Sequence, residues 1–151
     1  MKKLLIFVSF ILITAISSGL SAQEKTSNYV GAIARKKTYS ALYVLNSADE
    51  KHISATLRNM NNALEDPRLK GKLALELIAF GDGVAVYLKD GKFLDQLNLL
   101  RNKGVRLAQC ENTIRERKID KSGLFDFINY VPSGNGEIII LSAEGWAIVH
   151  P

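Results

Sequence analysis

The only cysteine of the chain, Cys110, stands where a predicted strand meets a predicted helix. Residues 105–109, with apolar Val105, Leu107 and Ala108, predict a strand that ends at Cys110. Residues 113–116 have the spacing of a capping box, which predicts a helix start. A thiol beside a helix N-terminus meets free N–H groups and the positive end of the helix dipole. Because the thiolate is the form that attacks sulfur and electrophilic carbon, this position favours nucleophilic sulfur chemistry.

The charged neighbours of Cys110 have opposite effects on the formation of a thiolate. Arg106, Arg115 and Arg117 lie close in sequence and add positive charge, whereas the adjacent Glu111 opposes the formation of a thiolate. Free cysteines are also common as small buried apolar residues, which is the structural alternative. Sequence position alone leaves a reactive and a structural Cys110 equally open.

The other polar candidates carry weaker signals. His52 falls in the first predicted helix, where we expect a solvated side chain. His150 follows the last predicted strand, where a proton carrier near Cys110 competes with an ordinary surface histidine. No motif spacing supports a metal site built from these three residues, so we expect neither a metal nor a cofactor. Residues 81–83 (Gly-Asp-Gly) lack the dinucleotide and Walker patterns, which favours a tight turn over a phosphate loop.

The composition allows one domain. Of the 151 residues, 47% are hydrophobic and 23% are charged, so the chain is too apolar for a disordered protein. A single cysteine excludes an internal disulfide and any zinc site made of several cysteines.

Residues 1–22 have the three parts of a secretory signal peptide. Lys2 and Lys3 form a basic head, residues 4–17 form an uncharged apolar run, and small residues lead to a predicted cleavage site after Ala22. The apolar run is shorter than the ~20 residues that span a bilayer as a helix, so we expect cleavage, with an uncleaved anchor as the alternative. The cleaved protein is then expected to have no membrane span and to reside in a bacterial periplasm.

Cleavage also changes the charge of the protein. The signal peptide carries two lysines and no acidic residue, so its removal lowers the net charge from +5 to +3. A charge of this size, spread over the whole chain, does not indicate a nucleic-acid partner.

The rest of the chain alternates predicted strands and helices. Residues 23–38 are polar and predict a flexible arm or a leader strand before a domain at residues 39–151. The predicted strands are residues 41–45, 73–80, 105–109, 127–131 and 146–149, and helices are predicted to begin near residues 47, 84, 92 and 113. The residues predicted to face inward from the two longest helices are Ile53, Leu57, Met60 and Leu64, and Phe93, Leu94, Leu97 and Leu100.

Residues 137–141 are ambiguous, because their three isoleucines favour a strand while the strand–helix alternation favours a crossover helix that ends at Gly145. We favour the helix. Parallel strands joined by helical crossovers predict an α/β fold of one domain, with three layers (α/β/α) and a mostly parallel five-stranded sheet.

Ligand sites in such sheets lie beyond the carboxyl ends of the strands. This rule gathers five loops on one edge together with the only thiol: residues 46–47, 81–83, 110–113, 132–133 and 150–151.

Several of these residues resemble the DsrE/DsrF-like family. The resemblance rests on the Cys-x-Asn-Thr pattern of Cys110, Asn112 and Thr113 with Arg117 downstream, and on the Val-Pro-Ser-Gly of residues 131–134. Residues 143–151 resemble the ending of exported members, and the similarity extends over residues 39–151.

The resemblance implies a three-layer fold with a helix at residues 136–144, and assembly into trimers or hexamers. Some members of the family act in sulfur relays, in which a cysteine takes a persulfide sulfur from a donor protein and passes it to an acceptor. Here Cys110 would carry the sulfur, and Asn112, Thr113 and Arg117 would shape its loop and bind the negative charge.

Two functions therefore compete. The first is an exported sulfur carrier or sulfurtransferase-like protein that forms a persulfide on Cys110. The second is a non-catalytic oligomeric module of the same fold that binds a ligand or a protein. The known relays are cytoplasmic and some have a second cysteine nearby, whereas this chain has none, so Cys110 has no internal dithiol partner.

Overall fold

Five parallel strands form the centre of the computed structural model, which describes residues 29–151. Ile33–Pro151 forms one compact unit. The strands are β1 (Tyr39–Leu45), β2 (Leu73–Ala79), β3 (Arg106–Cys110), β4 (Asn129–Val131) and β5 (Ala147–Val149). Their order is β4-β3-β2-β1-β5, and every neighbouring pair is parallel. The predicted single-domain α/β fold is confirmed, and the sheet is wholly parallel.

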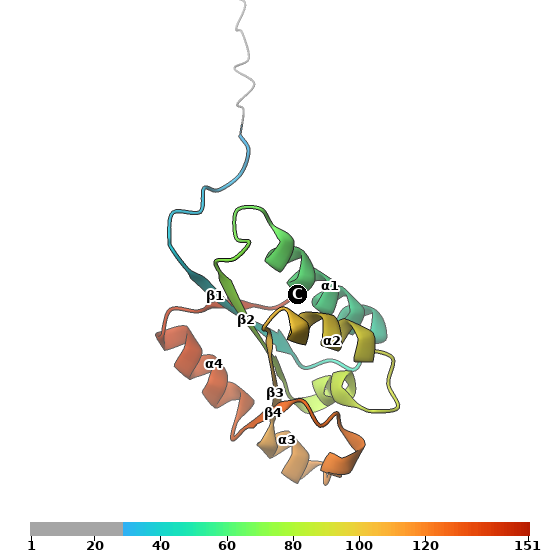
Figure 1. Cartoon of the computed structure of the whole chain (residues 1–151). Coiled ribbons are helices and arrows are strands. Elements are labelled where there is room, and N and C mark those ends of the chain that lie inside the picture. Colours follow the sequence, from blue (N-terminus) through green and yellow to red (C-terminus); the bar gives the residue numbers. More distant parts are fainter. Residues whose placement is uncertain (1–28) are drawn as a thin grey trace, which may run out of the picture. The chain divides into compact units, whose positions relative to one another are not determined.

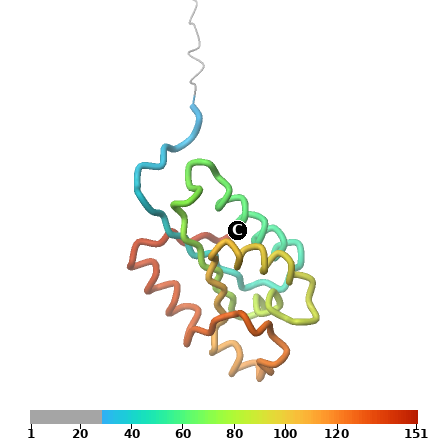
Figure 2. The backbone as a smooth tube through the Cα atoms, in the orientation of Figure 1, coloured from blue at the N-terminus to red at the C-terminus, as the bar shows by residue number. Residues whose placement is uncertain are grey.

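Helices cover both faces of this sheet (Figure 1). The α-helices are α1 (Glu50–Glu65), α2 (Leu94–Asn102), α3 (Glu111–Glu116) and α4 (Gly134–Ala143), and the 3-10 helices are η1 (Gly81–Tyr87) and η2 (Lys121–Gly123). α1 and α2 pack on one face and α4 packs on the other, which gives the three layers. Figure 2 shows that α3 and the start of α4 lie at the same end of the sheet.

The two faces bury unequal cores. The face beneath α1 and α2 holds the larger cluster, in which Leu45, Leu57 and Leu77 are almost completely buried. The opposite face holds a small cluster of Leu42, Val44, Ile78, Ala108 and Leu141. Since Leu141 is the α4 residue in that small cluster, the packing of this one helix closes the second core.

Helix α1 begins later than the predicted start at Ser47. The Asp49 carboxylate accepts a hydrogen bond from the His52 N–H at 2.7 Å and caps the helix, while the Ser47 hydroxyl accepts from the Asp49 N–H at 3.1 Å. An aspartate side chain is as good a cap as serine, and here Asp49 is the residue that reaches a free N–H of the first turn. The predicted inward face is confirmed, since Ile53 and Met60 are fully buried.

Helix α2 confirms most of its predicted face. Phe93, Leu97 and Leu100 are buried, but Leu94 is 41% exposed, so its predicted inward position is wrong. The buried residues follow a spacing of four and then three, and Leu94 lies about 100° around the helix from Phe93. Gly104, with a φ of +83°, follows the helix as predicted.

Helix α4 resolves the ambiguity at residues 137–141 in favour of a helix. The Ser133 hydroxyl accepts a hydrogen bond from the Gly136 N–H at 3.2 Å and caps it, and Gly145 with a φ of +87° follows its end. The strand propensity of the isoleucines is overridden because β5 must pair parallel with β1, which requires a crossover.

Strand β4 is shorter than predicted and begins at Asn129. Phe127 lies in the predicted strand, but its ring stacks on Phe125 at 5.1 Å between centroids, and the Arg101 guanidinium lies 4.6 Å from it. These ring contacts hold Phe127 outside the sheet ladder.

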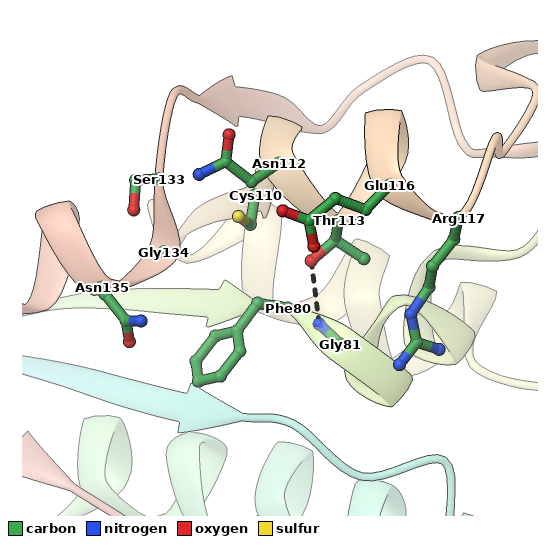
Figure 3. Close-up of a pocket in the computed structure, with 10 residues that line it drawn as sticks. All are labelled: Phe80, Gly81, Cys110, Asn112, Thr113, Glu116, Arg117, Ser133, Gly134 and Asn135. Atoms are coloured by element: carbon green, nitrogen blue, oxygen red, sulfur yellow. Dashed lines mark hydrogen bonds between the residues drawn. The ribbon is translucent and has the colours of Figure 1, made fainter.

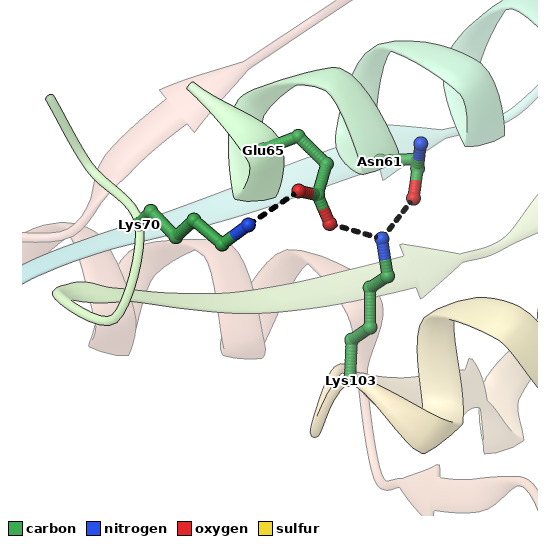
Figure 4. A network of polar contacts seen from close by, with 4 residues as sticks. All are labelled: Asn61, Glu65, Lys70 and Lys103. Atoms are coloured by element: carbon green, nitrogen blue, oxygen red, sulfur yellow. Dashed lines mark hydrogen bonds and ion pairs between the residues drawn. The ribbon is translucent and has the colours of Figure 1, made fainter. Parts of the chain in front are cut away.

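Charged side chains join α1 to the end of α2 (Figure 4). The Lys103 ammonium lies 2.5 Å from the Glu65 carboxylate and 2.7 Å from the Asn61 carbonyl oxygen, and Lys70 pairs with the same carboxylate at 3.1 Å. Hydrogen bonds from Lys103 and Lys70 lower the pKa of Glu65. The network lies in solvent, so it fixes a contact between two helices rather than adding much stability.

Part of the predicted amino-terminal region is described. Residues 29–38 contain no helix or strand, so a leader strand is not found there, and the predicted signal peptide lies outside the described residues. Within residues 29–151, no helix has the length and apolarity needed to cross a membrane.

The first turn of η1 lies against the end of β1. A Cβ atom on Gly83 would be 2.1 Å from the Leu45 carbonyl oxygen, a distance that no backbone could keep. This glycine is therefore required by close backbone approach.

We expect Gly83→Ala to lower the free energy of unfolding by about 3 kcal/mol or more, because the added methyl group must push η1 away from β1. Urea denaturation measures this loss. Gly123→Ala is the matched control, since a Cβ there meets nothing within 4 Å, and it should change stability by less than about 0.5 kcal/mol. Equal stability of the two variants would contradict the close approach.

Candidate functional site

Three of the five predicted edge loops meet at one cavity of about 260 Å³ (Figure 3). They follow β2, β3 and β4, which are neighbours in the sheet. The lining residues are Phe80, Gly81, Cys110, Asn112, Thr113, Glu116, Arg117, Ser133, Gly134 and Asn135. The loops after β1 and β5 contribute none of them, because these strands form the other side of the sheet.

Cys110 is both the last residue of β3 and the N-cap of α3. The predicted helix start at Thr113 is wrong, because α3 already begins at Glu111. Thr113 therefore lies within the first turn, where its N–H has no partner in the helix and is free to bind the sulfur. The Cys110 side chain is 5% exposed and lines the cavity.

The Cys110 sulfur accepts hydrogen bonds from two helix N-termini. Burial raises the pKa of the thiol, but the backbone N–H groups of Gly134, Thr113 and Asn112, together with the Thr113 hydroxyl, outweigh burial, so the pKa lies below its ordinary value of 9.0. Gly134 belongs to α4, whereas the other two belong to α3. The site therefore stabilises a negative charge on a buried sulfur atom.

The Gly134 N–H reaches the sulfur because α4 packs directly on Phe80. A Cβ on Gly134 would lie 3.0 to 3.3 Å from three carbon atoms of the Phe80 side chain. A larger residue would have to shift either α4 or the ring. The small residue at the start of α4 thus sets the distance between that helix and the end of β3.

Thr113 connects the loops after β2 and β3. Its hydroxyl oxygen accepts a hydrogen bond from the Gly81 N–H at 2.9 Å and donates to the Cys110 sulfur. Gly81 has a φ of +54°, a backbone conformation that favours glycine and turns its N–H toward Thr113. The hydroxyl group is therefore both a ligand of the sulfur and a link between two strand ends.

The cations near the cavity have acceptors of their own. Arg117 pairs with Asp82 at 2.6 Å, and Arg115 donates to the Asn112 carbonyl oxygen at 2.6 Å. Lys121 pairs with Glu111 at 2.8 Å, so the acid beside Cys110 has a cation of its own. Arg117 lines the cavity, but its charge is shared with Asp82.

The two histidines do not join this site. His52 is half-buried at the start of α1, and His150 is exposed after β5, which lies three strands from β3 and thus about 14 Å away across the sheet. The described residues contain no group of three or more His, Cys, Asp or Glu side chains that could hold a metal ion.

All four residues singled out from sequence, Cys110, Asn112, Thr113 and Arg117, line the same cavity. Phe80, Glu116 and Asn135 also line the cavity, although their positions were not predicted from the sequence. Gly81 and Ser133 belong to loops that the edge rule had placed there, and Gly134 follows them directly. Glu116 ends the capping-box pattern, but that pattern does not indicate that it lines a cavity, which depends on the position of α3.

Comparison with protein families gives a match over residues 30–151 to the model of the DsrE/DsrF-like family. The chain belongs to the DsrE/DsrF-like family. The predicted resemblance is thereby confirmed, and it covers most of the chain. No curated protein matches the chain at a significant level.

Solved structures support the fold of this DsrE/DsrF-like chain. The MTH1491 protein of unknown function from Methanobacterium thermoautotrophicum superimposes with a TM-score of 0.70 and 29% identity, covering 75% of this chain and 99% of its own. The ychN protein from E. coli gives a TM-score of 0.61 at 16% identity, covering 77% of this chain and 100% of its own. The BT1422 protein of unknown function from Bacteroides thetaiotaomicron gives a TM-score of 0.60 at 11% identity, covering 80% of this chain and 100% of its own. The last two show the fold alone.

We expect Thr113→Val to raise the pKa of Cys110, because valine keeps the shape of threonine but cannot donate to the sulfur or accept from Gly81. Alkylation by iodoacetamide, measured from pH 5 to pH 10, should slow several-fold near neutral pH. The unpaired Gly81 N–H should also cost about 1–3 kcal/mol of stability. Thr113→Ser keeps the hydroxyl and should restore both properties.

The lowered pKa of Cys110 also makes the stability of the native state depend on pH. Because the folded thiol has a pKa below its unfolded value of 9.0, the native state gains stability as the pH rises from the folded pKa toward 9.0. Thr113→Val should diminish that gain relative to Thr113→Ser, and an equal gain in both variants would contradict the role of the hydroxyl.

Proposed function

We propose that Cys110 accepts a sulfane sulfur as a persulfide and passes it to an acceptor thiol. The observation that carries this proposal is the set of four hydrogen bonds that favour an anionic sulfur at the wall of an open cavity. Membership of the DsrE/DsrF-like family supports a relation to sulfur relays. The cavity leaves room for the second sulfur atom and for part of its donor.

The transfer is a displacement at sulfur. The Cys110 thiolate attacks the outer sulfur of a donor R–S–S–H, a new S–S bond forms, and the donor's S–S bond breaks with its electron pair on R–S⁻. An acceptor thiolate then attacks the outer sulfur of the Cys110 persulfide and regenerates the Cys110 thiolate. The chain has no other cysteine, so the sulfur leaves to another molecule rather than through an internal disulfide.

The neighbouring residues of the pattern support the sulfur in different ways. Thr113 supplies a hydroxyl and an N–H, and Asn112 supplies an N–H. Arg117 contributes a positive charge that Asp82 reduces, so backbone N–H groups carry most of the stabilisation of the anion. The donor and acceptor are proposed to be other proteins or small persulfides.

One observation favours the alternative function, a non-catalytic binding module. The Cys110 side chain is 5% exposed, as a structural cysteine would be. This alternative requires that the folded protein take up no sulfur, which separates it from the sulfur carrier.

We expect the purified full chain to gain the mass of one sulfur atom after exposure to polysulfide, and dithiothreitol to remove it. Cys110→Ser should gain nothing, because serine cannot form a persulfide. Intact-mass spectrometry under native conditions measures both. Labelling of Cys110 only after unfolding would make the thiol structural and would support the binding module.

Export is part of the proposal. Cleavage after Ala22 would release the protein into the periplasm, and the same mass spectrum of protein made from the full sequence should correspond to a chain that begins at Gln23. A spectrum of the uncleaved chain would contradict export through a cleaved signal.

We also propose that copies of the chain assemble, as a trimer or hexamer, through α4. Residues 138–141 of this helix are four consecutive apolar residues, and two of them, Ile139 and Ile140, are 68% and 56% exposed. Adjacent large apolar side chains exposed on one helix are typical of an interaction surface, and within the described residues nothing covers this side of α4.

The double variant Ile139→Lys, Ile140→Lys should be a monomer, because charges on this surface cannot be buried against another copy. Size-exclusion chromatography with light scattering measures the mass of the assembly. Leu99→Lys is the matched control on α2, where Leu99 is 47% exposed, and it should keep the parent assembly. A monomeric parent, or an unchanged mass in the double variant, would contradict assembly through α4.

A further inference from the structure

Among residues 29–151, Glu116 is the one acidic side chain that lines the cavity. It is exposed at the end of α3, and its carboxylate makes no hydrogen bond or ion pair within the part of the chain that the structure describes. Figure 3 shows the carboxylate directed toward the cavity, above Thr113 and between Cys110 and Arg117 in that view. An unpaired negative charge therefore faces whatever enters.

The positive groups around the cavity do not offset Glu116. Arg117, the lining cation, is held by Asp82 at 2.6 Å. The remaining positive character comes from the N–H groups of α3 and α4, which are already directed at the Cys110 sulfur. The cavity is thus polarised, with its hydrogen-bond donors at the sulfur and a carboxylate at Glu116.

A polarised cavity distinguishes between sulfur donors by charge. A small inorganic dianion such as thiosulfate would bring two negative charges toward Glu116 without a free cation to receive them. A small persulfide that carries an ammonium group would place its reactive sulfur at the N–H groups and its cation at the carboxylate. Both interactions are then favourable at the same time.

Resting on the proposed function, we infer that the sulfur donor is a small aminothiol persulfide, of the class of cysteine persulfide, and that Glu116 selects it by binding its ammonium group. The Cys110 thiolate attacks the outer sulfur of the donor, and the aminothiol leaves as its thiolate with the electron pair of the broken S–S bond. The proton remains on the new persulfide and exchanges with water. No oxidant or reductant is consumed.

The test compares two donors that differ only in the ammonium group. Cysteine persulfide and 3-mercaptopropionate persulfide share the reactive sulfurs and the carboxylate. The ammonium group also lowers the pKa of the departing thiol, so the ratio of the two second-order rate constants must be compared with that of Glu116→Gln. We expect the ratio to be about three- to fivefold larger in the parent than in this variant, as for a solvent-exposed ion pair. The preference should decline as the salt concentration rises.

Glu116→Gln should lower the ratio of the two rate constants about three- to fivefold, to the value set by the two leaving groups alone. It should also speed loading from thiosulfate, because it removes the charge and keeps the shape. This substitution affects no hydrogen bond or ion pair of the described residues, so the variant should fold as the parent does. Glu111→Gln is the matched control, since Glu111 lies on the same helix, pairs with Lys121 and does not line the cavity. It should keep the parent ratio.

The outcomes separate the two proposals. A parent-like ratio in Glu116→Gln overturns the selection by Glu116 while Cys110 still accepts sulfur. If neither donor loads Cys110 in protein whose thiol reacts with iodoacetamide, the proposed function fails, and the inference fails with it.

Discussion

The close packing of Gly134 on Phe80 is the constraint on which the rest of the site depends. It brings the N-terminus of α4 to the end of β3, so that the Gly134 N–H reaches the Cys110 sulfur. The other donors to that sulfur come from α3, which follows Cys110 directly. Because α4 adds its own donor, the Cys110 sulfur lies among hydrogen-bond donors from two helices, α3 and α4.

Because α4 alone covers its face of the sheet, its position must be held by few contacts. Leu141 belongs to the small core on that face. Beside it, the buried Glu76 carboxylate pairs with Arg106 at 2.7 Å, and the Arg106 guanidinium lies 4.6 Å from the Trp146 ring. Burial raises the pKa of Glu76, and the nearby Glu137 of α4 adds to that effect against the opposing charge of Arg106. A charged pair on the two strands β2 and β3 therefore lies on the face of the sheet beneath α4, where apolar contacts are few.

This thin layer links the two proposals about the chain. The inner side of α4 delivers a hydrogen-bond donor to the sulfur, and its outer side presents two exposed isoleucines. A second copy packed on that outer side would stabilise the helix that shapes the cavity. Assembly and the chemistry of Cys110 would then depend on the same helix, although different faces of it serve each.

The sequence by itself determined the order of elements, the parallel sheet and the edge on which the cysteine lies. These follow from short-range patterns, namely apolar runs, helical spacing and turn residues, together with the rule that carboxyl ends of parallel strands share an edge. The pattern Cys110, Asn112, Thr113 with Arg117 also marked the right loop. These local rules failed at Leu94 and at the starts of α1 and α3. At each of these places several neighbouring residues could cap the helix or face the core, and the packing of the folded chain determines which of them does.

Only the tertiary structure decided which loops meet. Five loops lie on the edge, but the order β4-β3-β2-β1-β5 brings three of them to the cavity and leaves His150 three strands from Cys110. The donor from Gly134, the pairing of Arg117 with Asp82 and the open carboxylate of Glu116 depend on the same arrangement. A hydrogen bond or an ion pair between residues distant in sequence depends on distances of a few tenths of an ångström, and no local pattern in the sequence specifies those distances.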